Sequence, residues 1–206
     1  MWMRRTVQLA EQHNVAIGAH PSFPDLQGFG RRNMVLTSEE IKNYVTYQIG
    51  ALTPFTSNRK LQHVKPHGAM YNMATTDQDL AKAICEAILD IDQNIILIVL
   101  AGTHWAHIAQ EMGLRVAKET FADRALNSDG TLVTRSNPNA IIEEKQAVIE
   151  RSIQIATEGK ITAITGEEIP IDADTLCIHG DTPNSSDLAR SIRLSLETAN
   201  VDVLPL

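Results

Sequence analysis

Short apolar runs rich in β-branched residues alternate along the chain with longer segments in which apolar residues recur every three or four positions. The first pattern is typical of strands buried in a sheet, and the second is typical of helices with one buried face. Because strands and helices alternate, the pattern predicts an α/β fold with a parallel sheet and helices outside it. A flat doubly wound sheet and a barrel both satisfy it. The expected strands are Val15–Ala19, Leu61–His67, Ile95–Ala101, Arg115–Glu119 and Thr175–His179.

The helices between these strands have readable start and stop signals. Thr37, followed three residues later by Glu40, predicts a capping box at the start of one helix. Thr76 is expected to cap a second helix, and Thr103 a third that ends before Gly113. Two more helices are expected, at residues 143–158 before Gly159 and from about Ser185 onward. The helix after Thr37 places on one face Ile41, Tyr44, Val45, Ile49 and Leu52.

Residues 160–171 interrupt the alternation. Two β-branched runs flank Thr165-Gly166, which predicts a small β-hairpin that decorates the main sheet. The chain contains no linker, internal repeat or low-complexity stretch, so we expect one domain over residues 1–206.

Composition narrows the class of protein. The 206 residues are 43% hydrophobic and 21% charged, with a formal net charge of −7, which argues against nucleic acid or an anionic membrane as the main partner. No apolar run approaches the roughly 20 residues of a membrane-spanning helix, and the N-terminus lacks a signal-peptide pattern. Cys85 and Cys177 have no metal-like spacing, as expected for buried thiols in a reducing compartment. We therefore predict a cytoplasmic location.

Three of the seven histidines fall at or just past the end of an expected strand, and each is followed by Pro or Gly: His20, His67 and His179. In both candidate architectures, functional groups gather at the carboxyl ends of the strands. The sequence therefore predicts one shared site to which distant strands contribute.

The segment HVKPHGAMYN, residues 63–72, concentrates polar groups on one strand. Side chains alternate along a strand, so His63, Lys65 and His67 are expected on one face. Lys65 could hold a carboxylate or a phosphate, and His67 could act as acid or base near neutral pH. Tyr71 and Asn72 are further binding candidates from this segment. A solvated edge strand is the alternative.

The segment GAHPSFPDLQGFGRR, residues 18–32, predicts a shaped loop after a strand, where ligand contacts are common. Arg31 and Arg32 could bind a carboxylate or phosphate through two hydrogen bonds, and His20 and Asp25 are binding candidates in the same loop. Neither a dinucleotide-binding glycine pattern nor a P-loop is present.

Two later segments add carboxylates. In residues 119–135, Glu119 and Asp123 are acid/base candidates, while Arg124 and Arg135 are binding candidates; structural salt bridges are the alternative. In CIHGDTPNS, residues 177–185, we expect Asp181 to set the tautomer of His179.

These four segments, in this order, resemble the LamB/YcsF family, whose HVKPHGALYN motif closely matches residues 63–72. The resemblance covers essentially all 206 residues. The family is similar to the A subunit of prokaryotic 5-oxoprolinase. This implies a hydrolase that uses ATP, with magnesium, to open the lactam of 5-oxoproline to glutamate, together with partner B and C subunits.

The resemblance also implies an irregular (β/α) barrel of the polysaccharide-deacetylase-like, seven-stranded type. Family members usually begin with strands carrying DLNCDLGE and GFHAGD motifs, whereas this chain begins inside the helix that follows them. We therefore expect a barrel without its first two strands.

The resemblance suggests roles for the candidates. His179 or His67 would be the general base, Lys65 and Arg124 would stabilise negative charge, and an arginine at 31 or 32 would anchor the substrate carboxylate. Two rival functions stay open at this point: a metal-dependent deacetylase-like hydrolase, and a non-catalytic scaffold subunit of a lactam- or urea-type amidohydrolase. The need for a metal and homo-oligomerisation are also left open.

Overall fold

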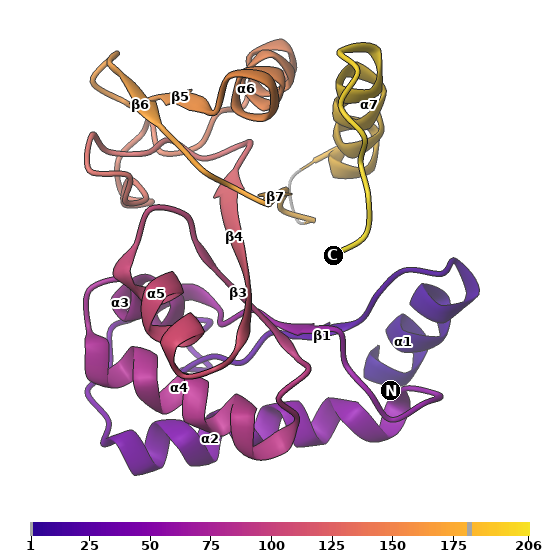
Figure 1. Ribbon diagram of the computed structural model, residues 1–206, viewed down its shortest axis with the longest axis vertical. Coiled ribbons are helices and arrows are strands. Elements are labelled where there is room, and N and C mark those ends of the chain that lie inside the picture. Colours follow the sequence, from indigo (N-terminus) through magenta and orange to yellow (C-terminus); the bar gives the residue numbers. More distant parts are fainter. Residues whose placement is uncertain (1, 181–182) are drawn as a thin grey trace. The chain divides into compact units, whose positions relative to one another are not determined.

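The computed structural model describes residues 2–180 and 183–206, in which helices alternate with short parallel strands (Figure 1). The predicted α/β class is confirmed. The chain divides into two compact units, the first comprising Met1–Val99 and Thr103–Val116, and the second Leu100–Gly102 and Ala117–Leu206. The single barrel domain over residues 1–206 stays a prediction, so each unit is described by itself.

The first unit contains three short parallel strands: β1 (Gly18–Ala19), β2 (His63–Val64) and β3 (Ile96–Leu100), which belongs to this unit up to Val99. Gly18 pairs with His63, and His63 pairs with Ile96. All three strands are shorter than predicted: β1 begins three residues later than expected, β2 ends before Pro66, and β3 ends before Gly102. Backbone pairing nevertheless continues past β1 and β2: the amide of Lys65 donates to Ala19 O (2.9 Å), and that of His67 to Pro21 O (2.8 Å).

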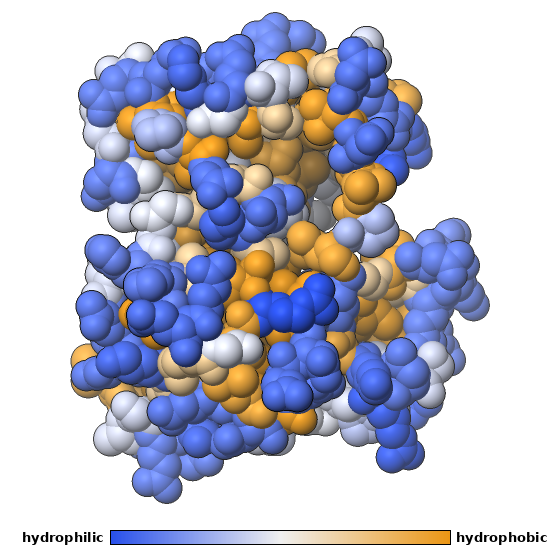
Figure 2. Space-filling view, viewed as in Figure 1, coloured by the Kyte–Doolittle hydropathy of each residue, from blue (hydrophilic) through white to orange (hydrophobic). Residues whose placement is uncertain are grey.

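Five α-helices accompany these strands: α1 (Trp2–Gln12), α2 (Ser38–Leu52), α3 (Gly68–Ala74), α4 (Gln78–Ile91) and α5 (His104–Glu111). A single 3₁₀ turn, η1 (Thr53–Phe55), follows α2 among the described residues. α2 and α4 pack side by side (Figure 1). On α2 the buried positions are Ile41, Val45 and Ile49, as the apolar pattern predicts, while Tyr44 is 37% exposed. The outer surface over α2, at the bottom of the view, is mostly hydrophilic (Figure 2).

The observed N-terminal caps of the helices agree in part with those predicted from the sequence. The capping box of α2 is confirmed: the hydroxyl of Thr37 accepts from the Glu40 amide (3.2 Å), and the Glu40 carboxylate accepts from the Thr37 amide (2.8 Å). For α4 the predicted N-terminal cap, Thr76, is wrong by one residue, because the cap is Asp77. The carboxylate of Asp77 accepts from the first-turn amides, including Leu80 at 3.0 Å, because a charged oxygen is a stronger acceptor than a hydroxyl.

α5 follows Thr103, as predicted, and ends before Gly113, which has a φ of 92°. The sequence does not predict α3, because Pro66-His67-Gly68, where the helix begins, is typical of a loop. Among the described residues, none of the helices has the length and apolar composition that a bilayer crossing requires.

In the second unit, β4 (Arg115–Phe121), which enters this unit at Ala117, pairs in parallel with β7 (Thr175–Cys177). Helices α6 (Lys145–Glu158) and α7 (Ser185–Thr198) pack against each other. α6 ends at Gly159, whose φ of 62° provides the left-handed cap that the sequence predicts. The buried cluster between these elements consists of Ala122, Val148, Ile149, Leu188, Ile192 and Leu196.

The predicted hairpin is also present. β5 (Lys160–Thr162) and β6 (Glu168–Pro170) pair antiparallel, with Ile161 opposite Ile169, and the hairpin lies beside α6 (Figure 1). Ile161 is fully buried. The guanidinium of Arg151 on α6 donates to Thr162 O (2.7 Å), and burial lowers the pKa of Arg151 to about 10. Ile161 also belongs to one buried cluster with Ile155 of α6, so an apolar contact and a buried cation both attach the hairpin to α6.

Candidate functional site

Asp123 and His179 meet at the carboxyl ends of β4 and β7. The strand register pairs Phe121 with Cys177, and two further residues on each strand lead to Asp123 and His179. Nδ1 of His179 lies 3.1 Å and 3.0 Å from the two carboxylate oxygens of Asp123. The imidazole also stacks on the ring of Phe121, with centroids 5.8 Å apart and an interplanar angle of 20°. The ring is therefore held both at its edge and on one face.

The electrostatics of this pair favour an ionised carboxylate. The side chain of Asp123 is only 3% exposed, against 24% for His179. Burial alone would raise the pKa of Asp123, but the hydrogen bond and the charge of His179 outweigh it, so the pKa lies below its ordinary value. An ionised carboxylate only accepts hydrogen bonds, and Asp123 accepts from the backbone amide of His179 (3.4 Å) as well as from its Nδ1–H. With the hydrogen on Nδ1, the lone pair of a neutral imidazole lies on Nε2, which has no hydrogen-bond partner among residues 2–180 and 183–206.

The partner of His179 differs from the one expected. The sequence suggests Asp181, which lies outside the described residues, whereas the structure places Asp123 against the ring. A signal for this pairing exists in the sequence, because both residues closely follow expected strands. Recognising it requires knowing that β4 and β7 are neighbours, which periodicity does not reveal.

Other predicted residues of this unit have structural contacts. Glu119 on β4 is 2% exposed, and its backbone oxygen accepts from the Ala101 amide at 2.8 Å. Arg124 is 6% exposed, and its guanidinium donates to Ala140 O (3.1 Å) and Val133 O (2.6 Å), so it organises the loop of residues 133–140. Arg135 is exposed on that loop. Ligand contacts by these three side chains stay predictions.

In the first unit, His20 and His67 are brought together past the ends of β1 and β2. Nε2 of His20 lies 3.0 Å from Nδ1 of His67. The other nitrogen of each ring faces a backbone carbonyl: Nδ1 of His20 is 2.5 Å from Lys65 O, and Nε2 of His67 is 2.8 Å from Phe29 O. Both nitrogens of His67 are thus engaged, which makes it less suited than His179 to the role of general base.

The remaining residues of segment 63–72 divide between structural and exposed positions. His63 lies against Gly18, where an added Cβ would be 2.1 Å from Nε2 of the ring. Burial, and then the charge of Lys65, lower the pKa of His63, so it stays neutral at neutral pH. The ammonium of Lys65 lies 6.0 Å from the ring centroid of the buried Tyr71. Asn72 is exposed on α3.

Asp25 organises the loop of residues 20–32. Its carboxylate accepts hydrogen bonds from the amides of Gly28 (2.9 Å) and Arg32 (3.2 Å), and it forms an ion pair with the Arg32 guanidinium. The Arg32 side chain, followed by these backbone contacts, lowers the pKa of Asp25 to about 2 against the opposing effect of burial. Arg32 is therefore bound within its own loop. Arg31 lies over the ring of Phe29, 5.4 Å from its centroid.

The same loop approaches α3 so closely that glycine is required. Gly68 has a φ of 60°, and a Cβ there would lie 2.5 Å from Gly30 O. That oxygen accepts the first-turn amide of Ala69 at 2.9 Å. The loop thus caps α3 with its own backbone.

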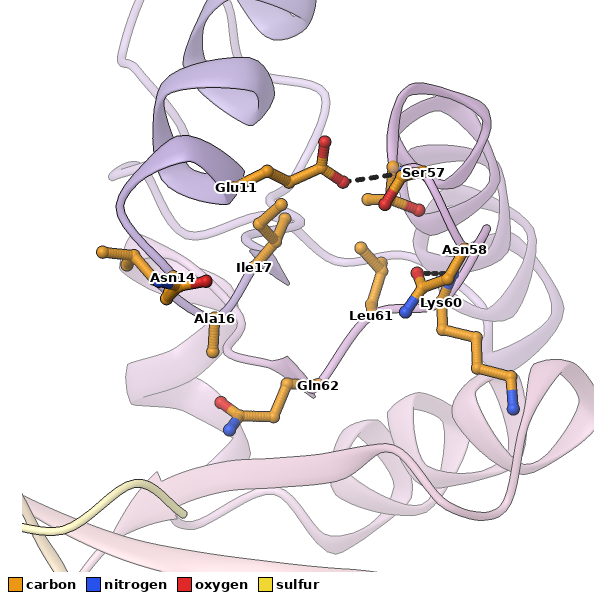
Figure 3. A pocket seen from close by; sticks show the side chains of 11 residues that line it. Glu11, Asn14, Ala16, Ile17, Ser57, Asn58, Lys60, Leu61 and Gln62 are labelled. Atoms are coloured by element: carbon orange, nitrogen blue, oxygen red, sulfur yellow. Dashed lines mark hydrogen bonds between the residues drawn. The ribbon is translucent and has the colours of Figure 1, made fainter.

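A cavity of about 430 Å³ lies at the amino ends of β1 and β2 (Figure 3). At its wall, the carboxylate of Glu11 accepts from the Ser57 amide at 2.7 Å. None of the predicted site residues lines it. The lining is formed by Glu11, Asn14, Val15, Ala16, Ile17, Thr56, Ser57, Asn58, Lys60, Leu61 and Gln62.

Within the described part of the chain, no group of three or more His, Cys, Asp or Glu residues is arranged to hold a metal ion.

Comparison with known proteins agrees with the motifs. The model of the LamB/YcsF family matches residues 1–206. The chain is 53% identical over 206 residues to the 5-oxoprolinase A subunit of Pyrococcus furiosus, covering 99% of this chain and 81% of that protein. It is 50% identical over 208 residues to the 5-oxoprolinase A subunit of Alkaliphilus metalliredigens, covering 100% of this chain and 81% of the relative.

Among solved structures, the crystal structure of a lactam utilization protein from Thermus thermophilus matches with a TM-score of 0.90 and 44% identity, over 99% of this chain and 82% of that one. The family resemblance of the sequence motifs is thereby confirmed. The chain belongs to the LamB/YcsF family.

Proposed function

We propose that this chain is the A subunit of an ATP-dependent 5-oxoprolinase, which hydrolyses the lactam of 5-oxo-L-proline to L-glutamate together with partner B and C subunits. Two relatives, which are 53% and 50% identical to this chain, are named as the A subunit of 5-oxoprolinase, and this supports the assignment. The observation that carries a catalytic role for this chain is the Asp123–His179 pair, with Nε2 of the imidazole left as a base.

The chemistry explains why ATP would be needed. An unstrained five-membered lactam is a poor electrophile, so water attacks its carbonyl carbon slowly. Transfer of a phosphoryl group from ATP, with magnesium as the counter-ion, to the amide oxygen makes that oxygen a good leaving group. Water then adds to the carbon and the ring C–N bond breaks, which leaves the γ-carboxyl group of glutamate as an acyl phosphate. A second water hydrolyses this acyl phosphate and releases phosphate. One 5-oxoproline, one ATP and two water molecules thus give glutamate, ADP and phosphate.

In this scheme His179 acts on the water. Its Nε2 takes a proton as the water oxygen bonds to the carbonyl carbon, and Asp123 stabilises the imidazolium that forms. The proton then passes to the ring nitrogen as the C–N bond breaks. Arg31 is the proposed anchor for the substrate carboxylate and Lys65 a proposed contact for developing negative charge. Arg32 is not assigned this role because Asp25 engages it.

The test measures ATP-dependent glutamate formation by the complex assembled from this chain and its B and C partners. His179→Gln should lower kcat by about 100-fold or more if Nε2 is the general base. His104→Gln, an exposed position on α5, is the matched control and should leave kcat unchanged. If the assembled His179→Gln complex turns over normally, the base is elsewhere and this chain contributes scaffold. A complex that forms glutamate without this chain would reject the assignment altogether.

A further inference from the structure

A buried arginine of the second unit joins three segments beside the Asp123–His179 pair. Arg151 lies on α6 and is 9% exposed. Its Nη1 donates to Thr162 O of β5 at 2.7 Å, and its Nη2 donates to Arg124 O at 3.3 Å. Because Arg124 directly follows Asp123 in the chain, the guanidinium is bonded to the residue next to the carboxylate that holds His179.

This arginine is costly to bury. Burial lowers the pKa of Arg151 to about 10, so the side chain is still charged at neutral pH. Within residues 2–180 and 183–206, no carboxylate forms an ion pair with it, and its enclosed Nε–H has no hydrogen-bond partner. An unbranched apolar side chain would avoid the desolvation of an unpaired cation. What the guanidinium supplies instead is a planar set of donors that reaches two carbonyls at once.

The segment that follows β4 is held along one edge by a loop. Asp123 O accepts from the Ile142 amide at 3.0 Å, and the Ala125 amide donates to Ala140 O at 3.0 Å. In an extended chain, the backbone groups of successive residues point to alternate edges. The carbonyl of Arg124, which lies between these two residues, therefore points to the opposite edge, where Arg151 donates to it.

On that opposite edge the backbone partner changes. The amide of Ala122 donates to the carbonyl of the last residue of β7 at 3.3 Å, whereas Leu126 O accepts from the Ile164 amide, just after β5, at 2.8 Å. Arg124 O lies between these two contacts, and its donor is the side chain of Arg151. The arginine thus supplies a hydrogen bond at the point where β7 ends and the hairpin begins to pair.

Fixing this carbonyl also fixes the backbone from which the Asp123 side chain projects. The peptide unit before Arg124 is held through Asp123 O, and the peptide unit after it is held through Arg124 O. The pKa of Asp123 follows from its burial, its contacts with His179 and its backbone hydrogen bonds. The route from Arg151 to the carboxylate therefore runs through the main chain.

We propose that Arg151 is a positioning residue, whose hydrogen bond to Arg124 O sets the backbone orientation in which Asp123 aligns His179. The catalytic consequence rests on the proposed function, whereas the effect on the imidazole does not. A carboxylate that turns away from Nδ1 no longer selects the tautomer with hydrogen on that nitrogen. Misplacing a catalytic group by about 1 Å lowers a rate by about 100-fold, so a fraction of such a shift is measurable.

The first readout is long-range ¹H–¹⁵N correlation NMR of the His179 ring in the full chain at about pH 8.5, where an imidazole is neutral. The wild-type ring should carry hydrogen on Nδ1. In Arg151→Met, which removes the donors and keeps an unbranched side chain, the ¹⁵N shift of Nε2 should move toward the protonated-type value. The second readout is glutamate formation by the assembled complex, in which kcat should fall by about 10-fold or more with KM nearly unchanged.

The matched control is Arg190→Met, the same change at an exposed position on α7. It should alter neither the shift of Nε2 nor kcat. Urea unfolding of both variants separates positioning from a purely structural role, because a loss of stability alone leaves the tautomer of the folded chain unchanged.

The two readouts fail separately. A wild-type tautomer of His179 in folded Arg151→Met would overturn the proposal, whatever the value of kcat. A shifted tautomer with a normal kcat would support the positioning by Arg151 and would instead reject His179 as the base of the proposed reaction.

If Arg151→Met does not fold, Arg151→Lys takes its place, because lysine keeps the charge but not the planar set of donors. An ammonium on a single nitrogen cannot match both carbonyls, so the shift of Nε2 should move in the same direction by a smaller amount. A wild-type tautomer in this variant would then overturn the proposal.

Discussion

The carboxylate of Asp123 contacts Nδ1 of His179 at 3.0 Å although 56 residues separate them in the sequence. The contact aligns the ring and fixes which nitrogen carries the proton. Asp123→Asn keeps the shape of the side chain but replaces one accepting oxygen with a donor, which favours the wrong imidazole tautomer. We expect kcat for glutamate formation by the assembled complex to fall by about 100-fold or more, with KM changing much less.

The matched control is Asp187→Asn, an exposed position in the first turn of α7 whose carboxylate pairs with Arg190. It should retain full activity. Circular dichroism of both variants checks that the fold is kept. Equal activity of Asp123→Asn and Asp187→Asn would remove Asp123 from the mechanism.

Asp25 should make the stability of the first unit sensitive to acid. Its pKa is about 2 in the folded chain, below the ordinary value of 3.8. Because the folded pKa is lowered, this contribution is fully present above the ordinary value and is lost as the pH falls toward the folded one. Asp25→Asn should lower the melting temperature at about pH 7 and weaken its dependence on acid below about pH 4. The measurement is the melting temperature of the wild-type chain and of Asp25→Asn at each pH in this range. If the melting temperatures of the two proteins fall in parallel with acid, the prediction is contradicted.

Gly68→Ala should destabilise the chain because both the backbone and the space oppose it. The φ of 60° is left-handed, and the new Cβ would lie 2.5 Å from Gly30 O. The left-handed conformation alone costs about 1–2 kcal/mol, so the free energy of unfolding should fall by at least this amount. Gly50→Ala, inside α2 with no atom within 4 Å of the new Cβ, should instead raise it by about 0.5–1 kcal/mol. Urea unfolding measures both; a loss at Gly50 equal to that at Gly68 would contradict this account.

Thr37→Ala should shorten or loosen α2. The variant removes the hydroxyl that accepts from the Glu40 amide, at a cost of about 1 kcal/mol. Thr46→Ala makes the same chemical change at an exposed position inside α2, where alanine is the better helix former, and should be neutral or slightly stabilising. Chemical unfolding compares the two. Equal effects would mean that the capping box does not stabilise the helix.

The sequence predicts elements well where the signal is local. The capping box at Thr37, the glycine stop at Gly159 and the hairpin of residues 160–171 each depend on neighbours in the chain, and all three are confirmed. The strand bounds are predicted less well: four of the observed strands, β1, β2, β3 and β7, are shorter than predicted, whereas β4 continues to Phe121, two residues past its predicted end. Helix α3 escapes prediction because its first residues, following Pro66, have the composition of a loop.

The site is harder to predict because its contacts are not local. The sequence identifies His179 and Asp123 as candidates but not as partners, since only the pairing of β4 with β7 joins them. It also selects Arg32 as a substrate anchor on its residue type, whereas the position of Asp25 determines what Arg32 binds. That the Asp123–His179 pair and the His20–His67 pair contribute to one shared site stays a prediction.

The backbone pairing that continues past β1 and β2 has a thermodynamic consequence. Because the amides of Lys65 and His67 are hydrogen-bonded to Ala19 O and Pro21 O, the fold itself constrains the main chain that carries these polar side chains. The backbone of this stretch therefore loses its conformational entropy when the protein folds rather than when a ligand binds. Binding here should therefore have a small entropic penalty from the backbone, and affinity should depend mainly on the chemistry of the side chains.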